Sequence, residues 1–366
     1  LTANSASSGG GGAFGGTLNN CILTDNSAGN CGGGTYCGTL NNCTLTANSA
    51  SSGGGGAFGR STDGLYCTLN NCALTGNSAG YGGGASDCTL NNCTLTGNSA
   101  YEGGGVYGGT LNNCIVYYNS ATNGANYGYC TFAYSCTTPL PEGPGNIDAD
   151  PILLTTTHLS DQSPCIGRGS PEYASGVDID GEPWLDPPCM GADQFVPGAA
   201  IGPLTVAIKA AYTNIATGFA VSFVADNTGP IRASAWDFGD GARATNQAYA
   251  SHTWAEAGDY SVVFHAYNDS HPDGVNATVL VHVVPQPIFY AAVDSPNPLP
   301  PFTSWETAAT NIQDAVDAAA LPPGVAGTPL VLVTNGVYAT GEHAVHGLMG
   351  NCVAVTKPLT LRSVNG

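Results

Sequence analysis

Positively charged residues are rare in this sequence of 366 residues. Only 7 residues are Lys or Arg, whereas 26 are Asp or Glu, so the formal net charge is −19. So few cations cannot replace the counterions of a phosphate backbone, which excludes nucleic acid as the main partner. The sequence also lacks any apolar run of about 18 residues, the length that crosses a bilayer. We therefore expect no membrane span.

Cysteine, in contrast, is abundant, with 14 residues. This usage is high for a reducing compartment and is typical of proteins in an oxidising environment. The few Lys and Arg residues also leave trypsin-like proteases little to cut. Both features predict an extracellular or cell-surface location.

A repeat dominates the first third of the chain. The pentapeptide Thr-Leu-Asn-Asn-Cys occurs five times, and its cysteines are separated by 22, 29, 21 and 21 residues. The longer interval is one period plus an insertion around residues 60–66. The five cysteines are Cys21, Cys43, Cys72, Cys93 and Cys114.

The composition of the repeat selects a β-solenoid over a helical repeat. Gly runs, Asn pairs and Thr in every period are poor helix formers. Cys93 and Leu95 are two positions apart with Thr between them, which is the pattern of a strand with one buried face. Asn pairs and Gly runs supply the corners. We expect one coil per period, stacked at about 4.8 Å, with like residues in columns.

Two interpretations of the cysteines stay open. Stacked neighbours lie within the Cα range of a disulfide, but a column of buried free thiols is the simpler arrangement for the five repeat cysteines. Cys67 and Cys88, which immediately precede the Thr of their blocks, are the better disulfide candidates.

The repeats resemble the right-handed parallel β-helix, or pectin-lyase-like, proteins of bacterial surfaces. The resemblance continues through residues 145–151, 163–167, 177–183 and 190–192. It implies that residues 1–197 are the later coils and the C-terminal cap of a β-helix. Cys165 and Cys189 would then staple that cap.

A second pattern follows, with alternating strands separated by turns, as in a small antiparallel sandwich. Residues 236–241 read Trp-Asp-Phe-Gly-Asp-Gly, and residues 252–254 and 257–260 continue the motif. These residues resemble the polycystic-kidney-disease (PKD) domain, with Trp236 and Phe238 buried on one strand. The resemblance implies an immunoglobulin-like sandwich over 203–284 that acts as an extracellular spacer or a weak glycan-binding module.

The third region, 288–366, resembles the opening of a pectin-lyase-like β-helix. Ile312, Ala315, Val316 and Ala319 have helical spacing, which predicts a short capping helix within 308–319. Strands are expected at 330–333, 353–355 and 359–361. The whole chain is thus expected to be all-β, with a β-helix, a sandwich and this one helix.

Taken cyclically, the chain contains the parts of one β-helix in the wrong order, with its first coils at the end. The assembly-edge residues would be Leu1, Thr2, Leu359, Thr360 and Leu361. Because open strand edges template pairing, we expect identical subunits to stack head to tail into an extracellular filament or surface fibre. The alternatives are a fragment of a larger tandem-repeat surface protein and a glycan-binding adhesin with exposed Tyr107, Tyr117 and Tyr118.

Catalysis is the least favoured function, although pectin-lyase-like folds include polysaccharide lyases and hydrolases. Lyase chemistry needs a base beside calcium-binding carboxylates, and hydrolysis needs a carboxylate pair. Residues 1–130 hold only four acidic residues and one arginine, with no stacked carboxylates. We predict no enzyme, no catalytic residue and no cofactor. Calcium is a minority interpretation of two pairs, Asp178 with Asp180 and Asp237 with Asp240.

Overall fold

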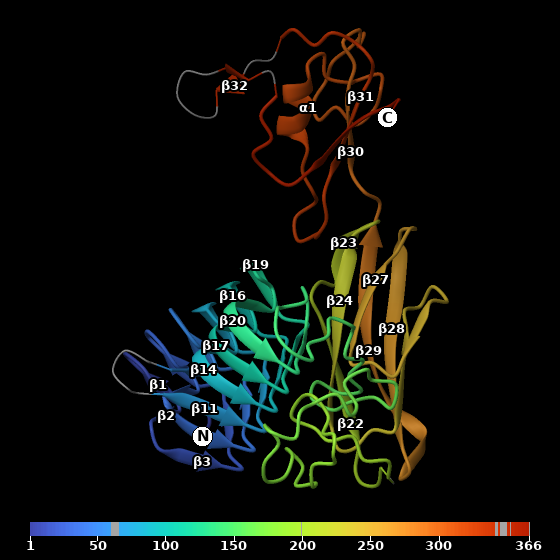
Figure 1. Ribbon diagram of the computed structural model, residues 1–366. Coiled ribbons are helices and arrows are strands. Elements are labelled where there is room, and N and C mark those ends of the chain that lie inside the picture. Colours follow the sequence, from blue (N-terminus) through green and yellow to red (C-terminus); the bar gives the residue numbers. More distant parts are fainter. Residues whose placement is uncertain (60–65, 199, 341–342, 345–349, 352, 366) are drawn as a thin grey trace.

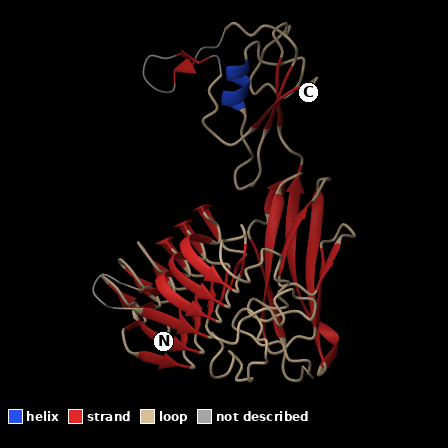
Figure 2. Cartoon of the chain, viewed as in Figure 1, coloured by secondary structure: helices blue, strands red, loops and turns tan. Residues whose placement is uncertain are grey.

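The computed structural model describes residues 1–59, 66–198, 200–340, 343–344, 350–351 and 353–365 (Figure 1). Most of the insertion expected around 60–66 therefore lies outside the described residues. The chain forms a stack of coils, a β-sandwich beside it, and a smaller unit that projects from one end of the sandwich (Figures 1 and 2).

The coils form a parallel β-helix with three sheets. The first and third sheets take one strand per coil, whereas the second takes two short strands from each of the first three coils and one longer strand from each later coil. The first sheet runs β1 (Ser5–Ala6), β5 (Ser27–Ala28), β9 (Ser49–Ala50), β13 (Ser78–Tyr81), β16 (Ser99–Glu102) and β19 (Ser120–Asn123). The second contains β2 (Ala13–Phe14), β3 (Thr17–Asn19), β6 (Thr35–Tyr36), β7 (Gly38–Asn41), β10 (Ala57–Phe58), β11 (Cys67–Asn70), β14 (Ala85–Asn91), β17 (Val106–Asn112) and β20 (Tyr127–Ala133). The third runs β4 (Ile22–Thr24), β8 (Thr44–Thr46), β12 (Ala73–Thr75), β15 (Thr94–Thr96), β18 (Ile115–Tyr117) and β21 (Cys136–Thr137).

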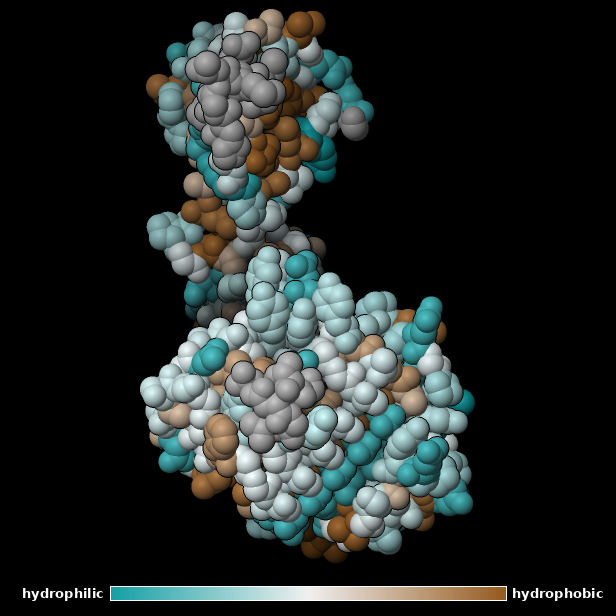
Figure 3. Space-filling model, turned by 60° about the vertical axis from the view of Figure 1, so that its left-hand side comes forward, coloured by the Kyte–Doolittle hydropathy of each residue, from teal (hydrophilic) through white to brown (hydrophobic). Residues whose placement is uncertain are grey.

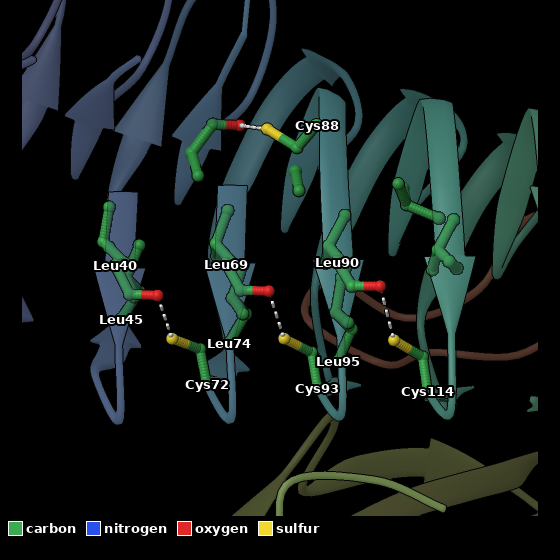
Figure 4. Close-up of a cluster of buried hydrophobic side chains, with 14 of the residues drawn as sticks. Leu40, Leu45, Leu69, Cys72, Leu74, Cys88, Leu90, Cys93, Leu95 and Cys114 are labelled. Atoms are coloured by element: carbon green, nitrogen blue, oxygen red, sulfur yellow. Dashed lines mark hydrogen bonds between the residues drawn. The ribbon is translucent and has the colours of Figure 1, made fainter. Parts of the chain in front are cut away.

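Like residues stack on like, as the repeat predicts. In β11, Leu69 pairs with Leu40 on one side and Leu90 on the other, and all three are buried. The repeat cysteines form a parallel column of free thiols (Figure 4). The thiol of Cys93 donates to the carbonyl of Leu69 in the preceding coil, at 3.5 Å. Apolar columns and thiol contacts together fill the interior.

The Asn residues hold the corners in two ways. The second Asn of each pair has positive φ, for example +53° at Asn71, a conformation that Asn tolerates well. A separate column of buried amides joins the coils through side-chain hydrogen bonds. In that column Asn77 donates to Asn98 Oδ1 and accepts from Asn48 Nδ2, both at 2.9 Å.

Residues 150–195, here called the flank segment, differ from the cap that the sequence predicts. They run as mostly irregular chain along the side of the coils (Figure 2). Residues 138–149 are the part that covers the last coil. The second Asn of successive pairs binds the flank segment: Asn113 donates to Ser170 O at 2.8 Å, Asn92 to Tyr173 O at 2.7 Å, and Asn71 to Val177 O at 2.8 Å.

The sandwich has two sheets. One contains β22 (Thr205–Ala210), β24 (Ala220–Thr228) and β27 (Tyr249–Thr253); the other contains β23 (Asn214–Ala216), β29 (His271–Val284), β28 (Gly258–Asn268), β25 (Ala233–Asp237) and β26 (Arg243–Thr245). Trp236 and Phe238 are buried, as predicted, together with Trp254. Trp236 Nε1 donates to Gln247 O at 2.9 Å, so its polar atom is satisfied inside the core.

The C-terminal unit contains a parallel sheet of β30 (Ile288–Ala291), β31 (Leu330–Val333) and β34 (Thr360–Ser363), and the short pair β32 (His343–Ala344) and β33 (Gly350–Asn351). Its helix α1 (Ile312–Ala318) begins after Asn311, whose side chain accepts from Asp314 N at 2.8 Å. The strand predicted at 353–355 does not form, because the backbone of Ala354 bonds the side chain of Gln313 instead of a neighbouring strand.

Hydrogen bonds and ring contacts join the three parts. Tyr118 of the coils stacks on Tyr249 of the sandwich at 4.3 Å, so Tyr118 lies in a junction and not on a free surface. The sandwich in turn bonds the C-terminal unit through Ala216 N and Ala326 O, at 2.8 Å. The sandwich therefore fixes the C-terminal unit in position relative to the coils.

Candidate assembly interface

The first coil has an unpaired edge. Strands β1, β2 and β3 are each the last strand of their sheet and pair only with the second coil. Thr24 of the second coil bonds Leu1 O and Ala3 N, both at 2.9 Å. Because hydrogen bonds alternate between the two sides of a parallel strand, the backbone groups of Thr2 face outward, where no described strand pairs with them.

Side chains at this edge are more exposed than their counterparts in the next coils. Phe14 begins an aromatic column, stacking on Tyr36 with ring centroids 4.9 Å apart, and its side chain is 66% exposed. Leu18 is half-buried, whereas Leu40 below it is buried. The edge of the first coil thus presents both unpaired backbone and incomplete apolar columns.

The opposite end of the coils is covered. After β21 the chain turns back over the last coil, where Tyr134 N donates to Pro144 O at 2.7 Å. Ile147 then bonds both neighbours of Cys136: its N–H donates to Ser135 O at 2.9 Å and its carbonyl accepts from Thr137 N at 3.0 Å. Among the described residues, the last coil is therefore covered, whereas the strands of the first coil are paired on one side alone.

The C-terminal sheet has the reverse arrangement. Its first strand, β30, is covered by residues 302–309, through bonds from Tyr290 N to Phe302 O at 2.8 Å and from Ala309 N to Tyr290 O at 2.9 Å. Its last strand, β34, pairs only with β31 among the described residues. Leu361 on β34 is 41% exposed.

The five residues predicted for the assembly edges lie at the two open strands or directly beside them. Leu1 and Thr2 belong to the first coil, and Thr360 and Leu361 belong to β34. Leu359, just before β34, packs against the core of the C-terminal unit. Apolar side chains also gather on this unit, the upper lobe of the space-filling view (Figure 3), where Val355 and Val364 are exposed.

The flank segment brings a cluster of carboxylates together with a histidine. His158 Nε2 lies 2.7 Å from Asp180 Oδ2. Burial opposes the charged imidazolium, but Asp180, Asp193 and Asp178 outweigh it and raise the pKa of His158 to about 9. His158 is therefore a cation at neutral pH and supplies the positive charge of the cluster.

The carboxylates of this cluster are already engaged in turns. Both oxygens of Asp178 accept backbone N–H groups, from Asp180 and Glu182 on one oxygen and from Gln194 on the other. With the charge of His158 beside them, these residues fit a hydrogen-bonded turn better than a calcium site. The sequence pointed to Asp178 and Asp180, but not to His158 or Asp193, which are distant in sequence and meet only through the fold of the flank segment.

The other pair considered for calcium lies in the sandwich. Asp237 Oδ2 bonds Arg243 Nη2 at 3.1 Å, and Asp240 Oδ2 bonds His252 Nε2 at 2.7 Å. Neither belongs to a group of three or more metal-ligating side chains within the described residues. The two carboxylates hold the turn after β25.

The predicted disulfides do not form. Cys67, Cys88, Cys165 and Cys189 are all free thiols. Residues in register on adjacent coils have parallel Cα–Cβ bonds about 4.8 Å apart, which is longer than the Cβ separation of about 3.5–4.5 Å in a disulfide. In the flank segment, Cys165 N donates to Ser163 Oγ at 3.2 Å, while Cys189 Sγ accepts from Gln194 Nε2 at 3.2 Å.

The geometry of the sandwich agrees with a family comparison. Residues 203–283 match the PKD domain. A solved PKD domain, that of the human VPS10 domain-containing receptor SorCS2, covers 32% of this chain and 94% of its own length at 23% identity, with a TM-score of 0.20. No curated protein matches the chain.

PKD domains occur in extracellular proteins. Among the described residues, none of the helices has the length and apolar character needed to cross a membrane.

Proposed function

We propose that this chain is an extracellular structural protein whose coils are completed by those of a neighbouring unit. In this proposal the first coil of one copy receives β34 of the next copy, and the two parts form one continuous pectin-lyase-like β-helix. Repetition of the contact builds a head-to-tail filament or surface fibre.

The observation that carries the proposal is the complementary covering of the two β-units. The coils are covered after their last strand and open before their first, whereas the C-terminal sheet is covered before its first strand and open after its last. Both are parallel, so stacking β34 on the first coil keeps the direction of the chain from coil to coil. Unpaired strand edges of this kind template pairing with another strand.

The junctions support a linear assembly. The PKD domain holds the C-terminal unit away from the open coil of its own chain (Figure 1), so the partner of that coil is a second copy. The contact is heterologous, because one copy supplies its first coil and the other supplies β34. Contacts of this type continue into filaments unless the rotation closes a ring.

Electron microscopy of the purified chain over a range of concentrations tests the proposal. We expect filaments with one regular axial repeat per subunit. Leu361→Asp would place an unpaired charge on the edge of β34 and should abolish them. Leu280→Asp is the matched control, because Leu280 is 44% exposed on the sandwich, close to the 41% of Leu361.

Three outcomes contradict the proposal: single particles at every concentration, filaments of normal length from Leu361→Asp, or equal loss of assembly in both variants. Deletion of 288–366 gives a further check, since it should prevent assembly. The fluorescence of the buried Trp236 and Trp254 shows whether the PKD domain of the shortened chain is still folded.

A further inference from the structure

Tyrosine side chains from three successive coils meet on the outside of the β-helix. Tyr81 ends β13, Tyr107 lies on β17 and Tyr129 lies on β20. The ring of Tyr107 contacts both neighbours, with its centroid 5.1 Å from that of Tyr81 and 5.4 Å from that of Tyr129. These separations lie within the range of about 4.5–7 Å that aromatic pairs in contact adopt. The three residues are here named the tyrosine cluster.

The backbone of the coils places these rings side by side. Gly128 is the register partner of Tyr107 in the next coil, and a Cβ at Gly128 would lie 3.1 Å from Tyr107 Cδ2. The lack of a side chain at Gly128 therefore leaves room for the Tyr107 ring over β20. Tyr129, the next residue in the chain, has a positive φ of +54° and is 79% exposed. Tyr81 is 42% exposed, so both neighbours of Tyr107 are accessible from solvent.

The other aromatic contacts of the coils lack this combination of contact and access. The neighbouring aromatic column contains Phe14, Tyr36 and Phe58, and Tyr36 is its one phenol. Tyr118 stacks on Tyr249, but this pair lies in the junction with the sandwich, where the Tyr249 hydroxyl is buried. Among the described residues, the tyrosine cluster is therefore the place where phenols of successive coils contact each other at the surface.

We propose that the tyrosine cluster is a site of oxidative cross-linking, at which Tyr107 couples to Tyr81 or Tyr129 and joins two coils covalently. The oxidant is hydrogen peroxide, acting through a haem peroxidase. Each phenol loses one proton and one electron, and one peroxide molecule takes up both pairs to become two molecules of water. The two phenoxyl radicals then form one carbon–carbon bond between ring carbons ortho to the hydroxyls. The hydrogens of these two carbons transfer to the phenolic oxygens, which restores both aromatic rings as dityrosine.

Contact between the rings favours coupling over the other reactions of a phenoxyl radical. Groups held together in one molecule react at a high effective concentration. Exposed side chains also change rotamer within about nanoseconds, so the ortho carbons of touching rings come to face each other repeatedly. Residues 1–137 contain no Lys, so cross-links through Lys amines cannot join the coils. The cluster lies in later coils than the open one, and the proposal does not depend on the filament contact.

Peptide mapping after oxidation tests the proposal. Dilute protein is treated with a haem peroxidase and hydrogen peroxide, and the monomer is isolated under denaturing conditions, which removes molecules linked to one another. Cleavage after Glu102 separates Tyr81 from Tyr107, and cleavage after Leu111 separates Tyr107 from Tyr129. The expected product is a linked pair of peptides, one of which contains Tyr107. It should be lighter than the sum of its parts by two hydrogen atoms and should show dityrosine fluorescence.

Phenylalanine variants identify the residues that react. Tyr107→Phe keeps the ring but lacks the phenol, so it should lose the link between coils completely. Tyr81→Phe and Tyr129→Phe should each keep the link from Tyr107 to the remaining neighbour. Tyr101→Phe is the matched control, because Tyr101 is 59% exposed on β16 and contacts no aromatic ring among the described residues. Its yield of linked peptides should equal that of the unmodified sequence.

Three results would overturn the proposal. The first is intramolecular dityrosine at an unchanged yield in Tyr107→Phe. The second is dityrosine that occurs only between molecules, and the third is an equal loss of the link in Tyr107→Phe and Tyr101→Phe. Oxidation in urea that unfolds the coils adds a check on the role of the fold, since the preference for Tyr107 should then disappear; the same preference in unfolded protein would contradict the argument from ring contact.

Discussion

The buried column of Asn side chains makes a strong prediction at Asn77. Its Oδ1 accepts from Asn48 N and Asn48 Nδ2, and its Nδ2 donates to Leu45 O and Asn98 Oδ1, all at 2.9 Å. Asn77→Asp keeps the shape and the accepting oxygen but replaces the donor with a second acceptor. Leu45 O and Asn98 Oδ1 then face an oxygen instead of an N–H.

The cost follows from these two contacts. A buried polar group that loses its partner costs about 1–3 kcal/mol. Leu45 O loses the amide donor, whereas Asn98 Oδ1 still accepts from Asn77 N at 2.9 Å, so we expect a loss of about 1–3 kcal/mol. The new carboxylate is also buried, which disfavours its charged form and raises its pKa. The loss should therefore be smaller at acidic pH, where the protonated carboxyl can donate one hydrogen bond again.

Urea unfolding followed by far-UV circular dichroism measures this change, because the four Trp residues all lie outside the coils. Asn19→Asp is the matched control. Asn19 is exposed and uses only its Oδ1, which accepts from Asn41 Nδ2 at 2.7 Å. Equal unfolding midpoints for the two variants would refute the reasoning that the buried amide column joins the coils.

Three further predictions concern the corner, the flank segment and the sandwich. Gly55→Ala would place a Cβ 2.4 Å from two backbone oxygens, so it should strongly destabilise the coils. The Cβ of Gly76→Ala meets no atom within 4 Å, and this variant should cost only about 1 kcal/mol for a left-handed backbone conformation. The urea midpoints of unfolding of the two variants test this difference. The raised pKa of His158 means that its pairing with Asp180 stabilises the fold fully below pH 6.5 and is lost as the pH rises through about 9. Because His158 is 39% exposed, we expect only about 1 kcal/mol after screening, visible as a pH-dependent unfolding midpoint that is absent in His158→Gln. Trp236→Phe removes the bond to Gln247 O and should cost about 1–3 kcal/mol, measured by chemical denaturation; an unchanged midpoint would contradict the role of the buried indole N–H.

The coils are predictable from sequence because the same residues recur at the same positions in each period. Leu69 occupies the same position as Leu40 and Leu90, so the period of the repeat alone gives the stacking and the register. The flank segment is different, since its contacts join side chains of the coils to backbone carbonyls such as Ser170 O and Tyr173 O. A backbone acceptor leaves no residue signature, and so the sequence could not indicate where this segment lies.

The candidate sites divide in the same way, into parts that follow from local sequence patterns and parts that depend on the path of the flank segment. The strands that carry the predicted assembly edges could be expected from sequence, because strand patterns and the order of the coils are local properties of the sequence; the assembly itself stays a prediction. The meeting of His158 with Asp180 depends on where the flank segment docks. The disulfide between Cys165 and Cys189, which the resemblance to the β-helix cap implied, is not formed in the structure, where both thiols are free.

Because the coils repeat by translation, their number, and with it the length of the solenoid, can change while the contacts between neighbouring coils stay the same. A duplicated period would insert a coil whose neighbours on both sides present the residues it needs, such as Leu above and below Leu69. The open coil, the covered end and the PKD domain would keep their own contacts. Each duplication would lengthen the solenoid by about 4.8 Å, so duplication of a period could change the dimensions of the protein without any new interaction having to evolve.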